Sequence, residues 1–221
     1  MNKYYEAYDK RYRQVHDKGL TWSTNSNTKI VERIINKYHL EKESILEIGC
    51  GEGRDARYLL NESYNVIATD ISQEAIDYCI KKDITHKSNY KVLDVLSSNS
   101  QDKYGFIYSV ACLHMLVLDS DRNKYYEYIY NHLENNGYAL ILTMGDGIKE
   151  SESDISKAFD NIKRTHQESN QVIEVATTSC RIVNFDTLFK EISNNFEVVE
   201  YGITEIENHF DKIMYIVIKK H

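Results

Sequence analysis

The segment SILEIGCGEGRD, residues 44–55, is the clearest indication of the fold class. Its first five residues form a short apolar strand, which runs directly into three glycines at alternate positions, Gly49, Gly51 and Gly53. After the glycines, apolar residues recur at helical spacing. A strand, a glycine loop and a helix in this order are typical of the first unit of a nucleotide-binding α/β sheet, where the loop lies against the ligand.

Strand-like and helix-like segments alternate along the rest of the chain. Strands are expected at residues 44–48, 65–69, 90–93, 106–110, 138–143, 196–201 and 214–218. Helices are expected at residues 3–16 and 28–38, after the glycine loop, from Ser72, around Tyr125 and Ile129, and at residues 186–193. Gly137 is expected to end the helix that contains Tyr125. This alternation predicts an α/β fold with a doubly wound sheet and helices on both faces.

Length and composition fit a single domain over residues 1–221. The net charge of −7 disfavours binding to nucleic acid, because a polyanion repels an acidic chain that lacks a strong basic patch. No apolar run is long enough to span a membrane, and the first residues are too polar for a secretory signal. We therefore expect a cytoplasmic protein that binds neither nucleic acid nor membranes. The sequence does not define its oligomeric state.

The cysteines give no sign of a metal site. Cys50, Cys79, Cys112 and Cys180 are widely spaced and form no C-x-x-C pair. This spacing argues against a structural zinc site and against a disulfide framework. It fits a reducing cytoplasm, and we expect no bound metal.

The ends of the predicted strands carry the candidate ligand-binding residues, because open α/β sheets bind ligands beyond the carboxyl ends of their strands. The glycines allow close approach to the backbone, and the carboxylate of Asp70 can accept two hydrogen bonds from a ribose diol. An NAD-binding protein shares this logic, but its fingerprint is G-x-G-x-x-G, which the spacing here does not match. Glu47 and Glu52 also place negative charge at the loop. A ligand with a cationic end suits that charge better than a pyrophosphate does.

The sequence LEIGCGEGRDARYL, residues 46–59, resembles motif I of class I S-adenosylmethionine (SAM)-dependent methyltransferases. The order of motifs extends the resemblance over residues 28–144. It implies a seven-stranded Rossmann-like sheet with the last strand antiparallel, SAM as the cofactor and S-adenosylhomocysteine as the product. The cofactor-binding residues that it implies are Glu47, Gly49, Cys50, Gly51, Arg54, Asp70, Ile71, Asp94, Val95, Ala111 and Cys112.

The resemblance also assigns roles within that set. Glu47 supports the loop, while Gly49 and Gly51 pass beneath the methionine part of SAM. Asp70 holds the ribose, residues 94–95 meet the adenine, and the backbone at residues 111–112 meets the methionyl end.

Three of these residues have a plain structural interpretation as well. Asp70 can cap a helix, Asp94 can be an ordinary loop residue, and Arg54 can form a surface ion pair.

Two segments are expected to build the acceptor side. Residues 1–27 form a lid helix, with Tyr4, Tyr8 and Tyr12 on one stripe, and packing on the sheet edge is the alternative for these tyrosines. Residues 145–183 form an acceptor-side insertion, partly helical up to residue 170 and extended from 171. Trp22, in a polar segment, lines a site or fills a core.

The acceptor itself is a small molecule or a peptide. The chain has no proline and therefore lacks the Asp/Asn-Pro-Pro-Tyr/Phe motif of enzymes that methylate amino groups of DNA and glutamine. The GCGEGRD form of the loop resembles small bacterial methyltransferases of the thiopurine and tellurite-resistance type. It also resembles tailoring enzymes of peptide natural products, including those that esterify peptide C-termini in lanthipeptide-like pathways.

Three residues are the candidates for catalysis: His114, Arg181 and Tyr8. His114 follows the fourth strand and can act as a base or a hydrogen-bond donor. Arg181 can clamp a carboxylate with its two parallel N–H groups. Their alternatives are a histidine that caps the loop and an arginine in an ordinary ion pair.

These residues favour transfer to an oxygen nucleophile, such as the carboxylate of a peptide C-terminus or of a small molecule. Sulfur and nitrogen acceptors are the second possibility. A SAM-binding module without catalytic activity is the third, and an insertion that forms no ordered pocket would favour it.

Overall fold

A mixed seven-stranded sheet forms the centre of the protein, in the order β10-β11-β5-β4-β1-β2-β3. The computed structural model describes residues 3–22, 26–166, 169–192, 196–207 and 210–221. The strands are β1 (Ser44–Ile48), β2 (Asn65–Asp70), β3 (Tyr90–Val92), β4 (Tyr104–Val110), β5 (Leu133–Thr143), β10 (Glu197–Ile206) and β11 (Phe210–Lys219). The five strands from β1 to β5 pair in parallel, whereas β11 runs antiparallel to both of its neighbours. The predicted fold class is confirmed, including the antiparallel last strand.

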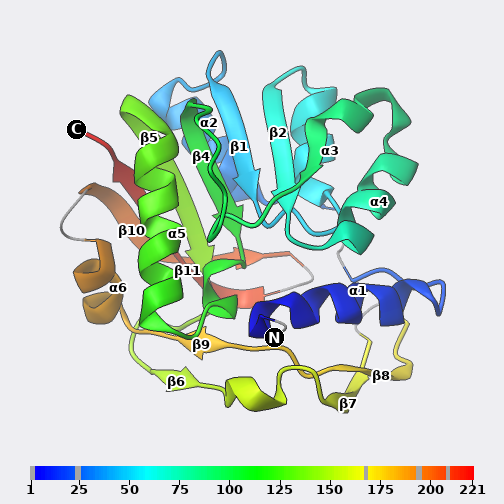
Figure 1. The fold of residues 1–221 in the computed structure, drawn as a ribbon. Coiled ribbons are helices and arrows are strands. Elements are labelled where there is room, and N and C mark those ends of the chain that lie inside the picture. The colour runs from blue at the N-terminus through cyan, green and yellow to red at the C-terminus, as the bar shows by residue number, and fades with distance from the viewer. Residues whose placement is uncertain (1–2, 23–25, 167–168, 193–195, 208–209) are drawn as a thin grey trace.

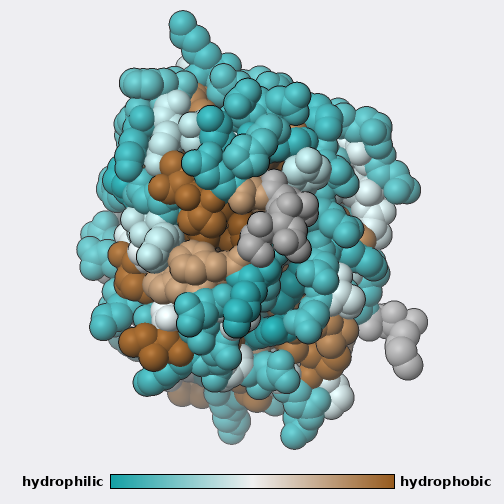
Figure 2. All heavy atoms as spheres, turned by 90° about the vertical axis from the view of Figure 1, so that its left-hand side faces the viewer, coloured by the Kyte–Doolittle hydropathy of each residue, from teal (hydrophilic) through white to brown (hydrophobic). Residues whose placement is uncertain are grey.

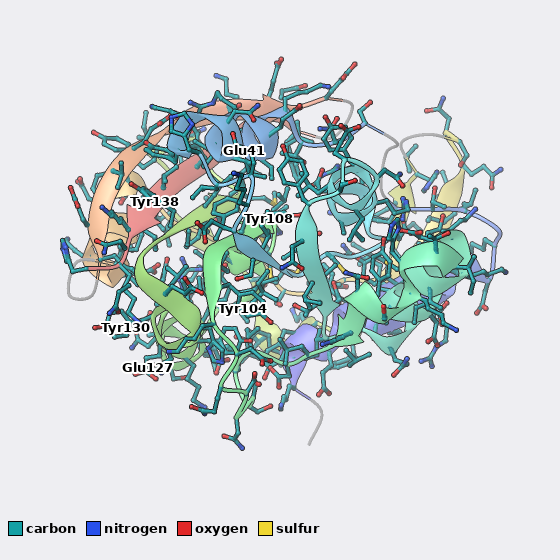
Figure 3. The ribbon with its side chains drawn as sticks, turned by 90° about the horizontal axis from the view of Figure 1, so that it is seen from above. Glu41, Tyr104, Tyr108, Glu127, Tyr130 and Tyr138 are labelled. Carbon is teal, nitrogen blue, oxygen red and sulfur yellow. The ribbon has the colours of Figure 1, made fainter. Side chains whose placement is uncertain are left out.

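Helices cover both faces of this sheet, as predicted (Figure 1). One face packs against α2 (Lys29–Tyr38), α3 (Arg54–Asn61) and α4 (Gln73–Lys82), and the other against α5 (Asp119–His132) and α6 (Phe185–Ile192). Successive side chains of β1 alternate between the two layers, so that Ile45 belongs to one apolar core and Leu46 to the other. Seen from above, Glu41 beyond α2 and Glu127 on α5 lie on opposite sides of the sheet (Figure 3).

The N-terminal segment, residues 3–22, crosses the carboxyl ends of the parallel strands (Figure 1). It contains a 3₁₀ turn, η1 (Tyr4–Glu6), and the helix α1 (Ala7–His16). Positions 1–2 and 23–25 of the predicted 1–27 segment lie outside the described residues.

The insertion after β5 packs against the far side of α1 (Figure 1). Its elements are β6 (Ser151–Glu152), η4 (Ile155–Lys157), β7 (Asn161–Thr165), β8 (Val172–Ala176) and β9 (Arg181–Ile182). β6 pairs with β9, and β7 pairs with β8.

Two local predictions differ from the structure. The helical part expected before residue 170 is reduced, in the described part of the insertion, to the single turn η4; the rest is extended or irregular. Gly137 does not cap α5, which ends at His132, but lies within β5. A Cβ at Gly137 would lie 2.9 Å from the carbonyl oxygen of Glu134, so this glycine serves a tight bend inside the strand. The helix predicted at 186–193 is α6, and residue 193 lies outside the described part.

The edge strand β10 carries exposed apolar side chains, among them Val199, Tyr201 and Ile203. Figure 2 shows that face of the molecule, where hydrophobic atoms gather within a mostly hydrophilic surface. Within the described residues, no helix has the length and apolar character needed to cross a membrane. Two further 3₁₀ segments are η2 (Ile84–Asn89), which precedes β3, and η3 (Leu113–Met115), which follows β4.

Candidate functional site

The glycine loop after β1 has a backbone shape that requires glycine. Gly49, Gly51 and Gly53 have φ angles of +73°, +53° and +71°, a left-handed region that side chains disfavour. A Cβ at Gly49 would lie 2.7 Å from Cys112 Sγ, and one at Gly51 would lie 2.5 Å from the hydroxyl oxygen of Tyr12. The loop is therefore pressed between β4's end and helix α1.

Asp70 at the end of β2 supports this loop. Its Oδ2 accepts a hydrogen bond from Gly51 N at 2.8 Å, and its Oδ1 accepts one from Ser72 N at 2.8 Å. Burial raises the pKa of Asp70 to about 6, although these backbone N–H groups act in the opposite direction. The side chain also borders a small cavity of about 70 Å³, whose other walls include Ile71, Asp94 and Val95. With Gly49 and Cys112, which also line it, six predicted cofactor residues thus meet in one cavity.

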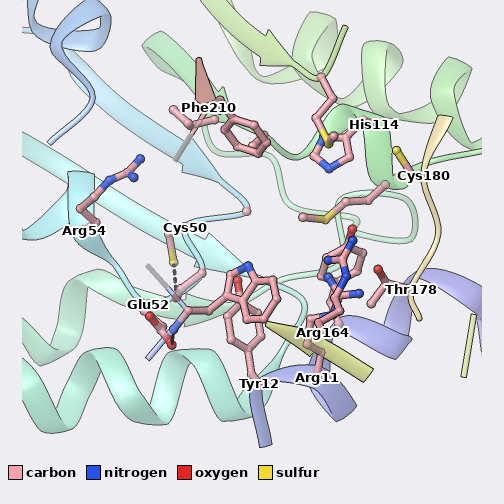
Figure 4. Close-up of a pocket in the computed structure, with 18 of the residues that line it drawn as sticks. Arg11, Tyr12, Cys50, Glu52, Arg54, His114, Arg164, Thr178, Cys180 and Phe210 are labelled. Atoms are coloured by element: carbon pink, nitrogen blue, oxygen red, sulfur yellow. Dashed lines mark hydrogen bonds between the residues drawn. The ribbon is translucent and has the colours of Figure 1, made fainter. Parts of the chain in front are cut away.

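A larger cavity of about 490 Å³ extends from the glycine loop to the insertion. Its loop end is acidic, with Glu47, Glu52 and Asp55 in the wall. Asp55 is paired with Arg54, whose Nη2 lies 2.9 Å from Asp55 Oδ2. Figure 4 shows Arg54 and Glu52 at this end. The side chain of Arg54 is 9% exposed and also lines the cavity, so the ion pair with Asp55 lies at the site and not on the open surface.

Glu47 is the least satisfied of these acids. It is 2% exposed, and within the described residues its Oε2 has no hydrogen-bond partner. Burial, with a further contribution from Asp55, raises the pKa of Glu47 to about 8. A cationic group placed here would gain a buried carboxylate as its partner.

The opposite end of the larger cavity is basic. Arg11 from α1 and Arg164 from β7 line it, together with Thr178 and Cys180 of the insertion (Figure 4). Sequence reasoning missed both arginines. The signal for Arg11 was its spacing: it follows Tyr8 by three residues and so lies on the predicted tyrosine face of the helix.

The two cavities are joined through shared walls. Tyr8, Tyr12, Gly49 and Met115 line both of them. One elongated ligand can therefore lie across the glycine loop with one end in each cavity.

The three predicted catalytic residues separate into two groups. His114 is buried and lines the larger cavity, and Tyr8 lines both cavities while its hydroxyl donates to the Ser179 carbonyl at 3.2 Å. Arg181 is not part of either cavity wall. Its Nη1 donates to the Val117 carbonyl at 2.7 Å and to Asp119 Oδ1 at 2.6 Å. These bonds hold Arg181 outside both cavities, so it cannot clamp an acceptor there in this conformation.

Two wall residues have strained backbones. Ala111, beyond the end of β4, has a φ of +53°, and Thr178 has a φ of +62°. A β-branched residue rarely adopts such an angle. Strain of this kind concentrates at functional sites, and here it lies on both sides of the larger cavity.

Polar contacts hold the N-terminal segment over the cavities. Lys3 forms an ion pair with Asp94, and Asp9 accepts a hydrogen bond from Ser72 Oγ at 2.7 Å. His16 lies between two carboxylates, with Nε2 2.9 Å from Glu52 and Nδ1 2.8 Å from Glu74. Of the predicted tyrosine stripe, Tyr4 packs into the α5 side of the core, whereas Tyr8 and Tyr12 line both cavities.

Sequence comparison relates this fold to known proteins. Residues 45–137 match a family model described as a methyltransferase domain. An uncharacterized methyltransferase of Schizosaccharomyces pombe is 34% identical over 86 residues, which are 38% of this chain and 59% of the relative. A ubiquinone biosynthesis O-methyltransferase of Rickettsia akari is 29% identical over 119 residues, which are 52% of this chain and 46% of the relative. The chain thus spans about half the length of these curated relatives.

Structural comparison extends the likeness to nearly the whole chain. The 1,6-didemethyltoxoflavin-N1-methyltransferase of Burkholderia thailandensis, solved with S-adenosylhomocysteine, superimposes with a TM-score of 0.73 at 14% identity. The superposition covers 98% of this chain and 88% of that one. The fold is that of the Rossmann-like methyltransferases. Residues 45–137 are thus similar to a methyltransferase domain, and the structural relative with this fold was solved with S-adenosylhomocysteine.

Proposed function

We propose that this chain is an enzyme that transfers a methyl group from SAM to an oxygen nucleophile of a small molecule or of a peptide end. The observation that carries the proposal is the pair of joined cavities at the glycine loop. The smaller one has the size and the walls for an adenosine edge, and the larger one has room for both the methionine end and an acceptor.

The residues at the loop fit SAM. The unpartnered Oε2 of Glu47 suits the α-ammonium group, since a buried carboxylate gains a charge-assisted hydrogen bond there. Asp70 has lone pairs left for two ribose hydroxyls after its two backbone contacts. Gly49, which has no side chain, lines both cavities.

The chain's own residues orient the reaction. The chemistry that SAM supplies when bound is a methyl group on positively charged sulfur, so that the acceptor's lone pair forms the new O–C bond and the electrons of the broken S–C bond stay on sulfur in S-adenosylhomocysteine. The cavity walls hold the acceptor close to the loop and in line, which alone lowers the barrier by several kcal/mol. If the acceptor oxygen carries a proton, His114 is positioned in the wall to take it.

The charges in the larger cavity support oxygen as the acceptor atom. The end away from the loop carries two arginines, which attract a carboxylate or phenolate and repel a protonated amine. A carboxylate is already ionised at neutral pH and needs no base. A peptide C-terminus or a small carboxylic acid is therefore the acceptor that we favour, with Tyr8 and His114 in contact with it.

Nitrogen or sulfur is the second candidate for the acceptor atom. It is supported by the structural similarity to the Burkholderia enzyme, which is an N1-methyltransferase by name.

We also propose a cytoplasmic setting without nucleic-acid or membrane partners. The four free cysteines fit a reducing compartment. The net charge of −7 opposes binding to polyanions.

Two measurements test this function. Calorimetric titration should detect S-adenosylhomocysteine binding and no NAD binding; heat with NAD alone would contradict the cofactor site. Mass spectrometry should then detect methylated products from a panel of carboxylates, phenols, thiols and amines, including a peptide with a free C-terminus. Products from thiols or amines only would contradict the oxygen acceptor but keep the methyltransferase. No product from any class, with S-adenosylhomocysteine still bound, would favour a non-catalytic module.

A further inference from the structure

Arg11 is a buried cation without an acidic partner. Arg11 is 5% exposed. Among the described residues, however, no carboxylate lies within ion-pair distance of its guanidinium group. Arg122, the other arginine of comparable burial, has Glu191 at 2.7 Å. Buried charges are usually paired because desolvation is costly. The exception at Arg11 therefore needs an explanation.

The surroundings of Arg11 orient its guanidinium but leave part of it available. Nε and Nη2 donate to the carbonyl oxygen of Ala176 at 3.0 and 2.7 Å, and Nη2 donates to that of Thr177 at 2.6 Å. Nη1 takes part in none of these bonds. The rings of Tyr8 and Trp22 lie 5.3 and 5.0 Å from the guanidinium carbon. Such aromatic contacts stabilise a cation without neutralising it.

Arg164 places a second cation in the same wall. It lies on β7, and the two arginine side chains stand next to each other in the cavity (Figure 4). Within the described part of the chain, its side chain forms no recorded hydrogen bond or ion pair. Burial, and to a smaller extent Arg164, lowers the pKa of Arg11 to about 10, which leaves Arg11 charged at neutral pH. An anion between them would relieve this repulsion.

The charge pattern of the whole cavity indicates at which end an anion binds. Acidic side chains line the loop end, where the cationic end of the cofactor is proposed to lie, and the two arginines line the other end. The chain as a whole carries a charge of −7, so two unneutralised arginines in one wall run against its composition.

We propose that Arg11 and Arg164 form an anion subsite that holds a carboxylate group of the acceptor. This inference rests on the proposed function, because it takes the larger cavity as the acceptor site. It replaces Arg181, which is engaged elsewhere, as the source of the clamp. Arg11 offers a fixed, oriented guanidinium, and the exposed Arg164 adds a second that can close onto the ligand.

The chain contains a built-in reporter for this subsite. Trp22 is its only tryptophan, and its ring lies 5.0 Å from the Arg11 guanidinium. Binding of a ligand to Arg11 should therefore change tryptophan fluorescence, independently of any turnover.

The experiment titrates the full chain, saturated with S-adenosylhomocysteine, with benzoate and with benzamide. The two probes have nearly the same shape and differ in charge. We expect a saturable change with benzoate and at least roughly tenfold weaker binding of benzamide, a difference of about 1.4 kcal/mol. Equal affinities would overturn the subsite. Tighter binding of inorganic phosphate than of benzoate would overturn the assignment to a carboxylate.

Variants identify the residues responsible. Arg11→Met and Arg164→Met should each remove most of the preference for benzoate, and Arg11→Lys should restore only part of it, because lysine keeps the charge but loses the planar fork. Lys163→Met is the matched control: it removes the same charge from the exposed neighbour of Arg164 and should leave the preference intact. Retention of the full preference in both methionine variants would overturn the inference.

Binding of S-adenosylhomocysteine separates the possible failures. A variant that still binds S-adenosylhomocysteine is folded at the glycine loop. If Arg11→Met no longer binds S-adenosylhomocysteine, the result for Arg164→Met, a substitution at an exposed position, decides the test. Wild-type protein that binds S-adenosylhomocysteine but does not prefer benzoate refutes the subsite alone. Wild-type protein that does not bind S-adenosylhomocysteine refutes the proposed function itself.

Discussion

At the scale of single residues, the glycine loop combines two constraints that mutation can separate. Gly49 and Gly19 have nearly the same φ, +73° and +70°, but an added Cβ meets Cys112 Sγ at 2.7 Å in the first case and nothing within 4 Å in the second. Strain alone therefore acts at Gly19, whereas strain and crowding act together at Gly49.

We expect Gly19→Ala to lower the free energy of unfolding by about 1 kcal/mol, the cost of a left-handed alanine. Gly49→Ala should cost roughly 1–3 kcal/mol more, because the end of β4 must shift. Chemical denaturation of both variants measures the difference. Equal losses would mean that the crowding at Gly49 is relaxed without cost.

Glu47 gives a prediction that depends on its protonation. Burial raises its pKa to about 8, so most of the free protein carries a protonated Glu47 at pH 7. If the α-ammonium group of the cofactor binds there, the pKa falls and a proton is released. Calorimetric titration with S-adenosylhomocysteine in buffers of different ionisation enthalpy should detect this release at pH 7, and Glu47→Gln should abolish it. Binding without proton release in the wild type would place the ammonium group elsewhere.

The sequence predicted the residues around the loop better than those of the acceptor side. Gly49, Gly51 and Asp70 follow strands directly, so their position at the sheet edge follows from the strand itself. Arg181 does not line either cavity in the structure, because it binds Asp119, the first residue of α5, which is 62 positions away in sequence. Pairing over such a separation cannot be inferred from local pattern.

At the scale of elements, α1 is the part that decides access to both cavities. Its contacts with the rest of the chain are both apolar and polar: Val15 packs against Ile173 and Val175 of the insertion, and His16 bridges Glu52 and Glu74. Burial lowers the pKa of His16, but the hydrogen bonds to both glutamates outweigh burial and raise it above 6.5. We propose that α1 opens to admit the cofactor.

This bridge predicts pH-dependent opening. A raised pKa means that the closed state binds the proton more tightly, so the stabilisation is complete below about pH 6.5 and is lost as the pH rises through the raised pKa. Stopped-flow Trp22 fluorescence should therefore show faster release of S-adenosylhomocysteine at higher pH across this range. His16→Gln should remove the dependence, while His221→Gln, at an exposed position, should keep it. A rate in the wild type that does not change with pH would exclude His16 as a latch.

Regular elements were predictable and the insertion was not, for one physical reason. The strands β1, β2 and β4 are buried apolar runs whose pattern reflects local burial. The strands β6 and β9 are two residues long and pair across 31 positions, from Ser151 to Ile182. Their extended form comes from tertiary contacts, which a polar sequence does not reveal.

At the scale of the whole molecule, the topology places different elements around each of the two cavities. In the proposed function, the ends of β1, β2 and β4 bind the cofactor, the insertion provides most of the wall around the acceptor, and α1 borders both ligands. Tyr8 and Tyr12 of this helix line both cavities. A change in the position of α1 on binding of one ligand would therefore affect the binding of the other ligand as well.

We expect cofactor and acceptor binding to be positively coupled. If α1 closes over S-adenosylhomocysteine, the entropy cost of that closure is already met when the acceptor probe binds. Benzoate affinity should rise by roughly fivefold or more when S-adenosylhomocysteine is present, with the reciprocal gain required by linkage. Fluorescence titration with and without S-adenosylhomocysteine measures this factor. Identical affinities would show that the two cavities act independently.

The position of the antiparallel strand β11 has a consequence for folding during synthesis on the ribosome. It lies between β5 and β10, and its Ile216 and Val217 pair with Ile141 and Leu140 of β5. Until residues 210–219 have been synthesised, β5 is an apolar strand with an open edge, which invites aggregation between nascent chains. The sheet is thus joined between β5 and β10 by β11, and the edge of β5 stays open until β11 pairs with it.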